Sequence, residues 1–139
     1  MSDYAKGLEG VIANESALSK VEGLEGQLSY LGYSIDELVE NCSFEEVTHL
    51  LHRGKLPNVT ELAEFEKSLR SNREVPQGVI DFLKSAPKDA NPMDILRTAV
   101  SMLGLYDKRA KVGEPDQEAN RKVALSLCAQ TPVIVAYYH

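Results

Sequence analysis

The histidines are the first residues to consider for chemistry, because imidazole serves both as a metal ligand and as an acid–base catalyst. His49 and His52 lie three residues apart, which places them on one face of a helix. A zinc site needs three or four ligands, and no third one lies nearby. Glu45, four residues before His49, is placed to pair with its imidazole, and His139 is the last residue. The sequence therefore predicts partly exposed structural histidines and no metal site.

Other catalytic patterns give no stronger signal. GLEG occurs at 7–10 and 23–26, but without the lysine and the strand–turn–helix setting of a phosphate loop. No serine lies in a GxSxG motif. The carboxylates fall mainly in the first turns of predicted helices, where they stabilise the helix dipole. We therefore expect no catalytic, cofactor-binding or metal-binding residue in these 139 residues.

The composition narrows the possible partners. The chain has 21 acidic and 15 basic residues, a formal net charge of −6, and 43% hydrophobic residues. Nucleic-acid binding needs clustered Lys and Arg, and the short group Lys108, Arg109 and Lys111 is typical of a solvated turn. No apolar run approaches the roughly 18 residues of a membrane span. We expect a cytoplasmic protein that binds neither nucleic acid nor membrane, with Cys42 and Cys128 reduced.

The elements that must position these residues begin with short strands. Val11-Ile12-Ala13 and residues 17–21 predict strands, and the second of these pairs with residues 27–30 across the Gly-containing turn 22–26. A lone hairpin is marginally stable in water, so this one must pack on another element.

From Ser34 onward the sequence predicts about six helices. Ser34-Ile35-Asp36-Glu37 and Ser43-Phe44-Glu45-Glu46 have the spacing of capping boxes, and they predict helices 34–40 and 43–53. Gly54 is expected to end the second helix. The next helices are expected to begin at Thr60, at Pro76, at Asn91-Pro92 and near Asp116. The helix after Asn91 should end at Gly104 and be buried around most of its circumference.

The last helix ends in an uninterrupted apolar run directly before His139. Helices normally end in Gly, Asn or a polar shift, and an exposed apolar end favours aggregation. We therefore expect this end to be buried against a partner subunit and the natural chain to continue. The residues expected at this homodimer contact are Val133, Ile134, Val135, Tyr137 and Tyr138.

Taken in order, the motifs of this chain resemble the start of citrate synthase, in particular the bacterial dimeric type with its methylcitrate-making relatives. The resemblance runs from Lys6 to His139. One departure is Asn91, where the family often has histidine; asparagine also caps a helix, so only a site role of that histidine is in doubt. The segments that carry the resemblance are Gly7–Ala13, Gly32–Leu38, Ser43–Leu51, Gly54–Pro57, Asn91–Ser101 and the final helix.

This resemblance implies a mainly helical, two-domain homodimer that condenses oxaloacetate with acetyl-CoA to citrate and CoA, at the entry to the tricarboxylic acid cycle. In the family an aspartate removes a methyl proton, histidines stabilise the enol and polarise the carbonyl, and arginines hold carboxylates. These residues belong to segments beyond His139, so none is carried over to this chain.

Residues 1–139 are then expected to form the N-terminal part of the large domain, without the small domain, and to be inactive alone. Two alternatives stay open. The first is a 2-methylcitrate synthase that uses propionyl-CoA, and the second is a non-catalytic helical dimerisation module.

Overall fold

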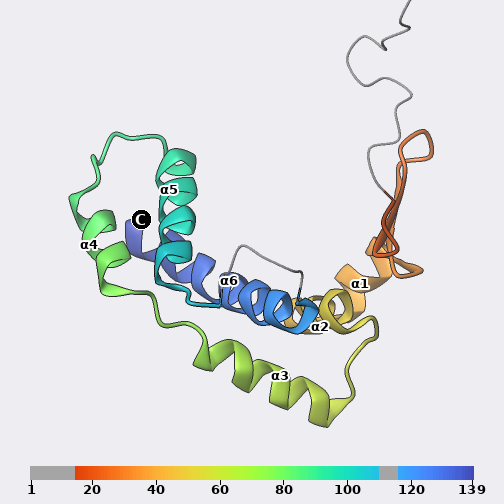
Figure 1. Ribbon diagram of the computed structural model, residues 1–139. Helices are drawn as coiled ribbons and strands as arrows, with labels where there is room; N and C mark the ends of the chain where they lie inside the picture. Colours follow the sequence, from red (N-terminus) through yellow and green to blue (C-terminus); the bar gives the residue numbers. More distant parts are fainter. Residues whose placement is uncertain (1–14, 110–115) are drawn as a thin grey trace, which may run out of the picture. The chain divides into compact units, whose positions relative to one another are not determined.

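The computed structural model describes residues 15–109 and 116–139. These residues form a short antiparallel sheet followed by six helices, which confirms the expected mainly helical fold (Figure 1). The chain divides into two compact units, Met1–Asn58 and Val59–His139. The strand expected at Val11-Ile12-Ala13 lies outside the described residues. Within the described ranges, no helix combines the length and the apolarity needed to cross a membrane.

The sheet of the first unit contains the predicted hairpin and one further strand. β1 (Ser19–Glu22) and β2 (Gln27–Tyr30) pair antiparallel, which confirms the hairpin. β3 (Tyr33–Ser34) pairs with β2 through a two-residue turn that the sequence did not reveal. In this turn φ is positive at both Leu31 (49°) and Gly32 (91°), as a type I′ turn requires. Leucine seldom adopts such a conformation, which explains why the turn was not predicted.

Two short helices complete the first unit. α1 (Ile35–Asn41) packs on β2 and β3 and so supports the hairpin. α2 (Phe44–Arg53) begins with a complete capping box, in which Ser43 Oγ accepts from the Glu46 N–H and the Glu46 carboxylate accepts from the Ser43 N–H. Gly54 ends α2 with φ of 82°. Both predicted helices are therefore confirmed.

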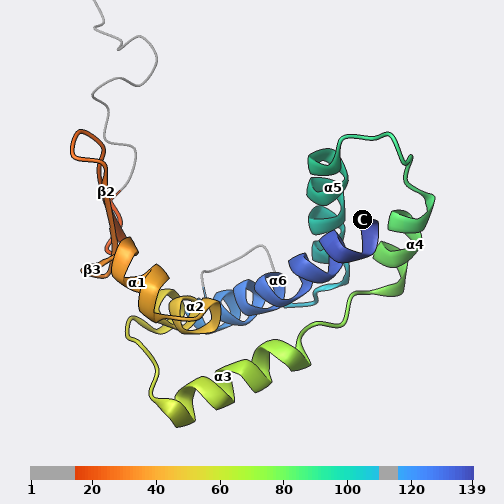
Figure 2. The same ribbon diagram turned by 180° about the vertical axis from the view of Figure 1, so that it is seen from behind.

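The second unit is helical throughout its described residues. α4, α5 and α6 pack against one another, and α3 packs against α6; Figure 2 shows α5 beside the C-terminal half of α6. Asn91 caps α5 through a hydrogen bond from the Met93 N–H, and Asp116 caps α6, as predicted. The four helices are α3 (Val59–Ser71), α4 (Gln77–Ser85), α5 (Pro92–Tyr106) and α6 (Gln117–Tyr138).

Two helix boundaries differ from the prediction. α3 begins at Val59, so Thr60 lies within its first turn and does not cap it. α5 continues through Gly104 to Tyr106, and it ends where the Asp107 N–H donates to the Leu103 carbonyl at 3.1 Å. A glycine ends a helix when its backbone turns left-handed, whereas Gly104 keeps the helical conformation.

The core of the second unit is built from one face each of α4, α5 and α6. In α5 the buried residues lie four apart, at Ile95, Ala99 and Leu103, while Met93 and Leu105 are exposed. The expectation that this helix is buried around most of its circumference is therefore wrong, because only one stripe meets α4 and α6. The other core residues of this cluster are Val79, Leu83, Ala86 and Ile134.

The apolar end of α6 is divided between this core and the surface. Ile134 is only 1% exposed and packs against core residues of its own chain, so it is not available to a partner subunit. Val135 and Tyr137 are 52% and 46% exposed. Val133 and Tyr138 are half-buried. The expected exposure of the apolar end is therefore wrong for Ile134, and the homodimer contact stays a prediction for the other four residues.

Candidate functional site

The two internal histidines lie in α2, and one of them has a clear structural contact. His49 is buried, and its Nδ1 lies 2.9 Å from the Lys55 carbonyl oxygen. A carbonyl oxygen only accepts, so Nδ1 carries the proton and ties the residues after α2 to the helix. His49 is thus more buried than the sequence suggested. Among the described residues, no group of three His, Cys, Asp or Glu side chains is placed to hold a metal ion.

The acidic residues at helix starts serve the helices themselves. Asp116 Oδ1 accepts from the N–H groups of Glu118 and Ala119, at 3.0 and 3.3 Å. Asp94, in the first turn of α5, pairs with Arg97 at 3.0 Å on an exposed surface. These contacts satisfy the N–H groups at the start of α6 and pair a surface charge of α5.

The main polar feature of the second unit is an ion pair directly after α5. Arg109 donates from Nε to Asp107 Oδ1 at 2.8 Å and from Nη2 to Asp107 Oδ2 at 2.9 Å. This is the two-pronged geometry in which guanidinium and carboxylate bind most strongly. The Arg109 backbone N–H also donates to Asp107 Oδ1 at 2.9 Å. The hydrogen bond from Arg109 holds the pKa of Asp107 below its usual value, while partial burial acts in the opposite direction.

Ser126 in α6 connects this ion pair to the end of α3. Ser126 is 4% exposed, and its hydroxyl accepts from Arg109 Nη2 at 2.9 Å. The hydroxyl proton faces two acceptors at 3.0 Å, Asn72 Oδ1 and the Lys122 carbonyl. Asn72 in turn donates to the Ser68 carbonyl at 2.8 Å. The buried hydroxyl is therefore satisfied in both its donor and its acceptor roles.

Lys108 and Arg109 lie in an exposed turn, as expected for a solvated basic turn, and the structure adds contacts that the sequence did not predict. Arg109 is held by Asp107 and Ser126, whereas Lys108 is exposed. Lys111 lies outside the described residues. Sequence reasoning missed the network, although a serine between Leu125 and Leu127 in an apolar stretch was a usable sign of a buried polar contact.

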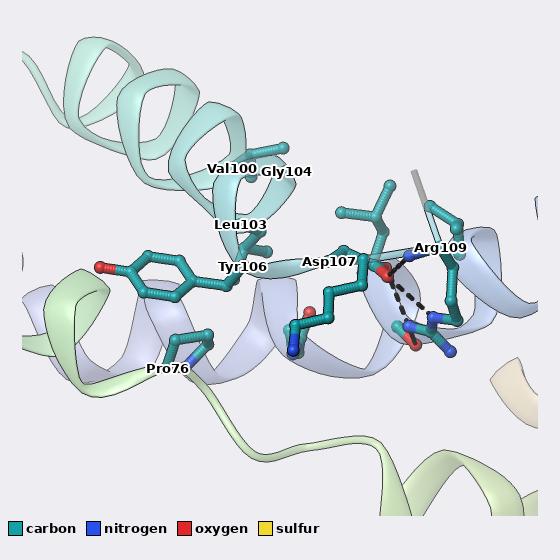
Figure 3. A pocket seen from close by; sticks show the side chains of 12 residues that line it. Pro76, Val100, Leu103, Gly104, Tyr106, Asp107 and Arg109 are labelled. Atoms are coloured by element: carbon teal, nitrogen blue, oxygen red, sulfur yellow. Dashed lines mark hydrogen bonds and ion pairs between the residues drawn. The ribbon is translucent and has the colours of Figure 1, made fainter. Parts of the chain in front are cut away.

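A cavity of about 490 Å³ lies beside the ion pair, between α5 and α6. Figure 3 shows the side chains of Asp107 and Arg109 facing each other, while Tyr106 extends away from them on the side where Pro76 lies. The remaining walls are mainly apolar. The apolar lining includes Val100, Leu103, Val123 and Leu127.

A second cavity of about 490 Å³ lies between the start of α5 and the end of α6. Its wall includes Tyr138, whose hydroxyl donates to the Pro87 carbonyl at 2.8 Å. Lys88 Nζ lies 5.6 Å from the centre of the Tyr138 ring. Met93 and Leu96 add apolar side chains to the lining of this cavity. These contacts explain why Tyr138, unlike Tyr137, is half-buried.

The two cysteines have structural positions. Cys42 ends α1, where its N–H donates to the Leu38 carbonyl at 2.9 Å, and it lies between α1 and α2. Cys128 is half-buried against the small cluster of Phe65, Leu69 and Ala129. Burial raises the pKa of the Cys128 thiol, which favours its uncharged form.

In the described residues, a short sheet is followed by six helices, and polar side chains connect some of these helices. The fold is therefore of the mainly helical class. The same fold occurs in a citrate synthase from the archaeon Thermoplasma acidophilum, solved with carboxymethyl coenzyme A and oxaloacetate. The TM-score is 0.86 at 22% identity, over 99% of this chain and 37% of that one. A sequence model described as "Citrate synthase, C-terminal domain" matches residues 7–139. The chain belongs to the citrate synthase family.

Its curated relatives include both kinds of synthase that the sequence left open. Identity to 2-methylcitrate synthase 2 of Corynebacterium glutamicum is 47% over 135 residues, or 97% of this chain and 35% of that protein. Identity to citrate synthase of Deinococcus radiodurans is 43% over 136 residues, 98% of this chain and 36% of that protein. The chain therefore spans about a third of the length of these relatives.

Proposed function

We propose that this chain is part of an acyltransferase that condenses acetyl-CoA with oxaloacetate to give citrate and CoA. The observation that carries the proposal is the family match over residues 7–139, together with 43% identity to a citrate synthase across nearly the whole chain. The cytoplasm is the proposed location.

Within such an enzyme, we assign these residues to the N-terminal part of the large domain. The polar groups described here are engaged in helix caps, in the Asp107–Arg109 pair and in the buried Ser126 contacts. They support the role of a scaffold on which other segments place the acid, the base and the carboxylate-binding groups. We expect the 139 residues to be inactive alone, because they span only about a third of the length of the synthases they match.

A 2-methylcitrate synthase, which uses propionyl-CoA, is the second candidate. The 47% identity to such an enzyme from Corynebacterium glutamicum supports it. The two substrates differ by one methylene, and a hydrophobic pocket separates such ligands by only about 1–3 kcal/mol. A few residues of the acyl site therefore decide the preference, and overall identity is a poor guide to it.

We also propose that the enzyme is a homodimer and that the exposed residues Val135 and Tyr137 lie at its contact. Ile134 is excluded from this contact because it fills the core of its own chain. Replacing Tyr137 by Glu should weaken self-association in sedimentation without unfolding the helices. An unchanged sedimentation coefficient would contradict the proposed contact.

The catalytic proposal is tested by CoA thiol release with oxaloacetate. The 139-residue chain and the complete reading frame that contains it are each assayed with acetyl-CoA and with propionyl-CoA. Activity of the complete product with acetyl-CoA supports citrate synthase, and a higher kcat/KM with propionyl-CoA supports the second candidate. A reading frame that ends at His139, with an inactive and stably dimeric product, would overturn both in favour of a dimerisation module.

A further inference from the structure

We propose that an acidic and partly apolar surface at the junction of α1 and α2 is covered, in the complete enzyme, by a basic segment of the same polypeptide that lies outside these 139 residues. The inference rests on the proposed function, under which this chain is part of a larger synthase. The chain spans about a third of the length of the relatives it matches, so most of such an enzyme lies outside it. We call this surface the junction face; its members are Asp36, Val39, Glu40 and Phe44.

The junction face consists of one side of α1 and the first residue of α2. Asp36, Val39 and Glu40 have the i, i+3, i+4 spacing that places side chains on one side of a helix. Leu38, on the other side of α1, is only 4% exposed. Val39 and Phe44 are 81% and 66% exposed, and Phe44 begins α2 directly after its cap. Two large apolar side chains therefore lie in solvent on either side of the junction, and such surface favours a partner.

The charges of the junction face act against the stability of α1 itself. Asp36 and Glu40 are four residues apart, a spacing at which like charges repel each other across one helical turn. Glu40 also lies in the last turn, where the helix dipole disfavours a carboxylate, and this turn has no basic residue. Within the part of the chain that the structure describes, no ion pair involves Glu40. A cation from another segment would offset both unfavourable terms.

The distribution of charge along the chain gives the sign of the partner. Residues 1–58 contain ten acidic and four basic residues, whereas residues 59–139 contain eleven of each. The whole net charge of −6 therefore belongs to the first unit. A second copy that brought its own junction face to this one would place like charges together, which disfavours that contact. The observations thus favour a segment that carries Lys or Arg beside apolar side chains.

Hydroxyl-radical footprinting compares the exposure of Phe44 in the complete enzyme and in the 139-residue chain. Phe65 is the matched reference in the same molecule, because it is also a phenylalanine and is only 7% exposed. In the 139-residue chain we expect Phe44 to be modified about nine times faster than Phe65, the ratio of their exposed fractions. In the complete enzyme the two rates should agree within about twofold, because Phe44 is then covered.

Substitution of Glu40 tests the charge of the covering segment. In the 139-residue chain, Glu40→Gln should not lower Tm, because it relieves the repulsion with Asp36. In the complete enzyme the same change should lower Tm by about 2 °C in about 0.02 M NaCl. This loss should disappear in about 0.5 M NaCl, because salt screens the ion pair. The matched control is Glu25→Gln, at an exposed carboxylate in the turn between β1 and β2, and it should have no salt-dependent effect on Tm in either chain.

CoA thiol release separates this proposal from the proposed function. If the complete enzyme releases CoA with oxaloacetate while Phe44 stays several times more reactive than Phe65, the covering segment is refuted and the synthase stands. A reading frame that ends at His139 would refute both.

Two further results would overturn the proposal. The first is protection of Phe44 that already appears in the 139-residue chain and grows with its concentration, because a second copy would then cover the junction face. The second is a change in Tm for Glu40→Gln that is equal in the two chains or independent of salt, because the covering segment would then carry no opposing charge.

Discussion

Replacing Ile134 by Ala tests whether the end of α6 belongs to the core of its own chain. Ile134 is 1% exposed and packs with Val79, Leu83, Ile95 and Ala99 from α4 and α5. The change removes three carbon atoms from a site that is almost completely buried. At about 0.8 kcal/mol for each buried carbon, the lost transfer free energy is about 2.4 kcal/mol. The cavity left behind adds to this, so we expect a loss of about 3–4 kcal/mol in the free energy of unfolding.

Urea unfolding followed by circular dichroism measures this loss. Ile134→Val should cost about 1 kcal/mol, and Val135→Ala, the matched control on the exposed face, less than about 0.5 kcal/mol. Sedimentation of the same variants separates folding from association. The reasoning is refuted if Ile134→Ala costs less than about 1 kcal/mol and instead dissociates an oligomer, because Ile134 would then lie between subunits.

The other predictions concern a helix cap and two titrating groups. Ser43→Ala should lower the free energy of unfolding by about 1 kcal/mol through loss of the capping box. Thr60→Ala, at a residue inside the first turn of α3, should lower it by less than half as much, and thermal unfolding of both variants measures the difference. The pKa of Asp107 is lowered in the folded chain, so its contribution is present above the usual carboxyl pKa and is lost as pH falls below it. Acid titration of unfolding should therefore show a smaller loss below pH of about 4 for Asp107→Asn, and an identical curve would contradict the ion pair. Cys128 should react with a disulfide reagent more slowly in the folded chain than in urea at the same pH, because burial raises its pKa; equal rates would contradict its burial.

Local signals predicted most helix boundaries. Ser43 with Glu46, Asn91 with Pro92, and Gly54 each satisfy backbone groups within a few residues, so their effect does not depend on the rest of the fold. Gly104 shows the limit of such signals. Glycine permits a helix stop without requiring one, and the backbone ends α5 only at Asp107.

The candidate site was harder to anticipate than the helices. Asp107 and Arg109 are close in sequence, but nothing local shows that Arg109 also reaches a buried serine 17 residues later. Lys108 and Arg109 lie in an exposed turn, as predicted, but the local sequence does not show that the arginine also contacts another helix. The packing of α6 beside the exit from α5 provides that contact.

The sequence by itself determined the family, the mainly helical fold and the order of its elements, because these depend on caps, periodicity and ordered motifs within short stretches. Only the tertiary structure decided which apolar residues meet. It placed Ile134 in the core while leaving Val135 and Tyr137 at the surface, and it brought Asn72, Ser126 and Arg109 together. The physical reason is that burial and long-range hydrogen bonds depend on which helix faces another, and residues adjacent in sequence point to different sides of a helix.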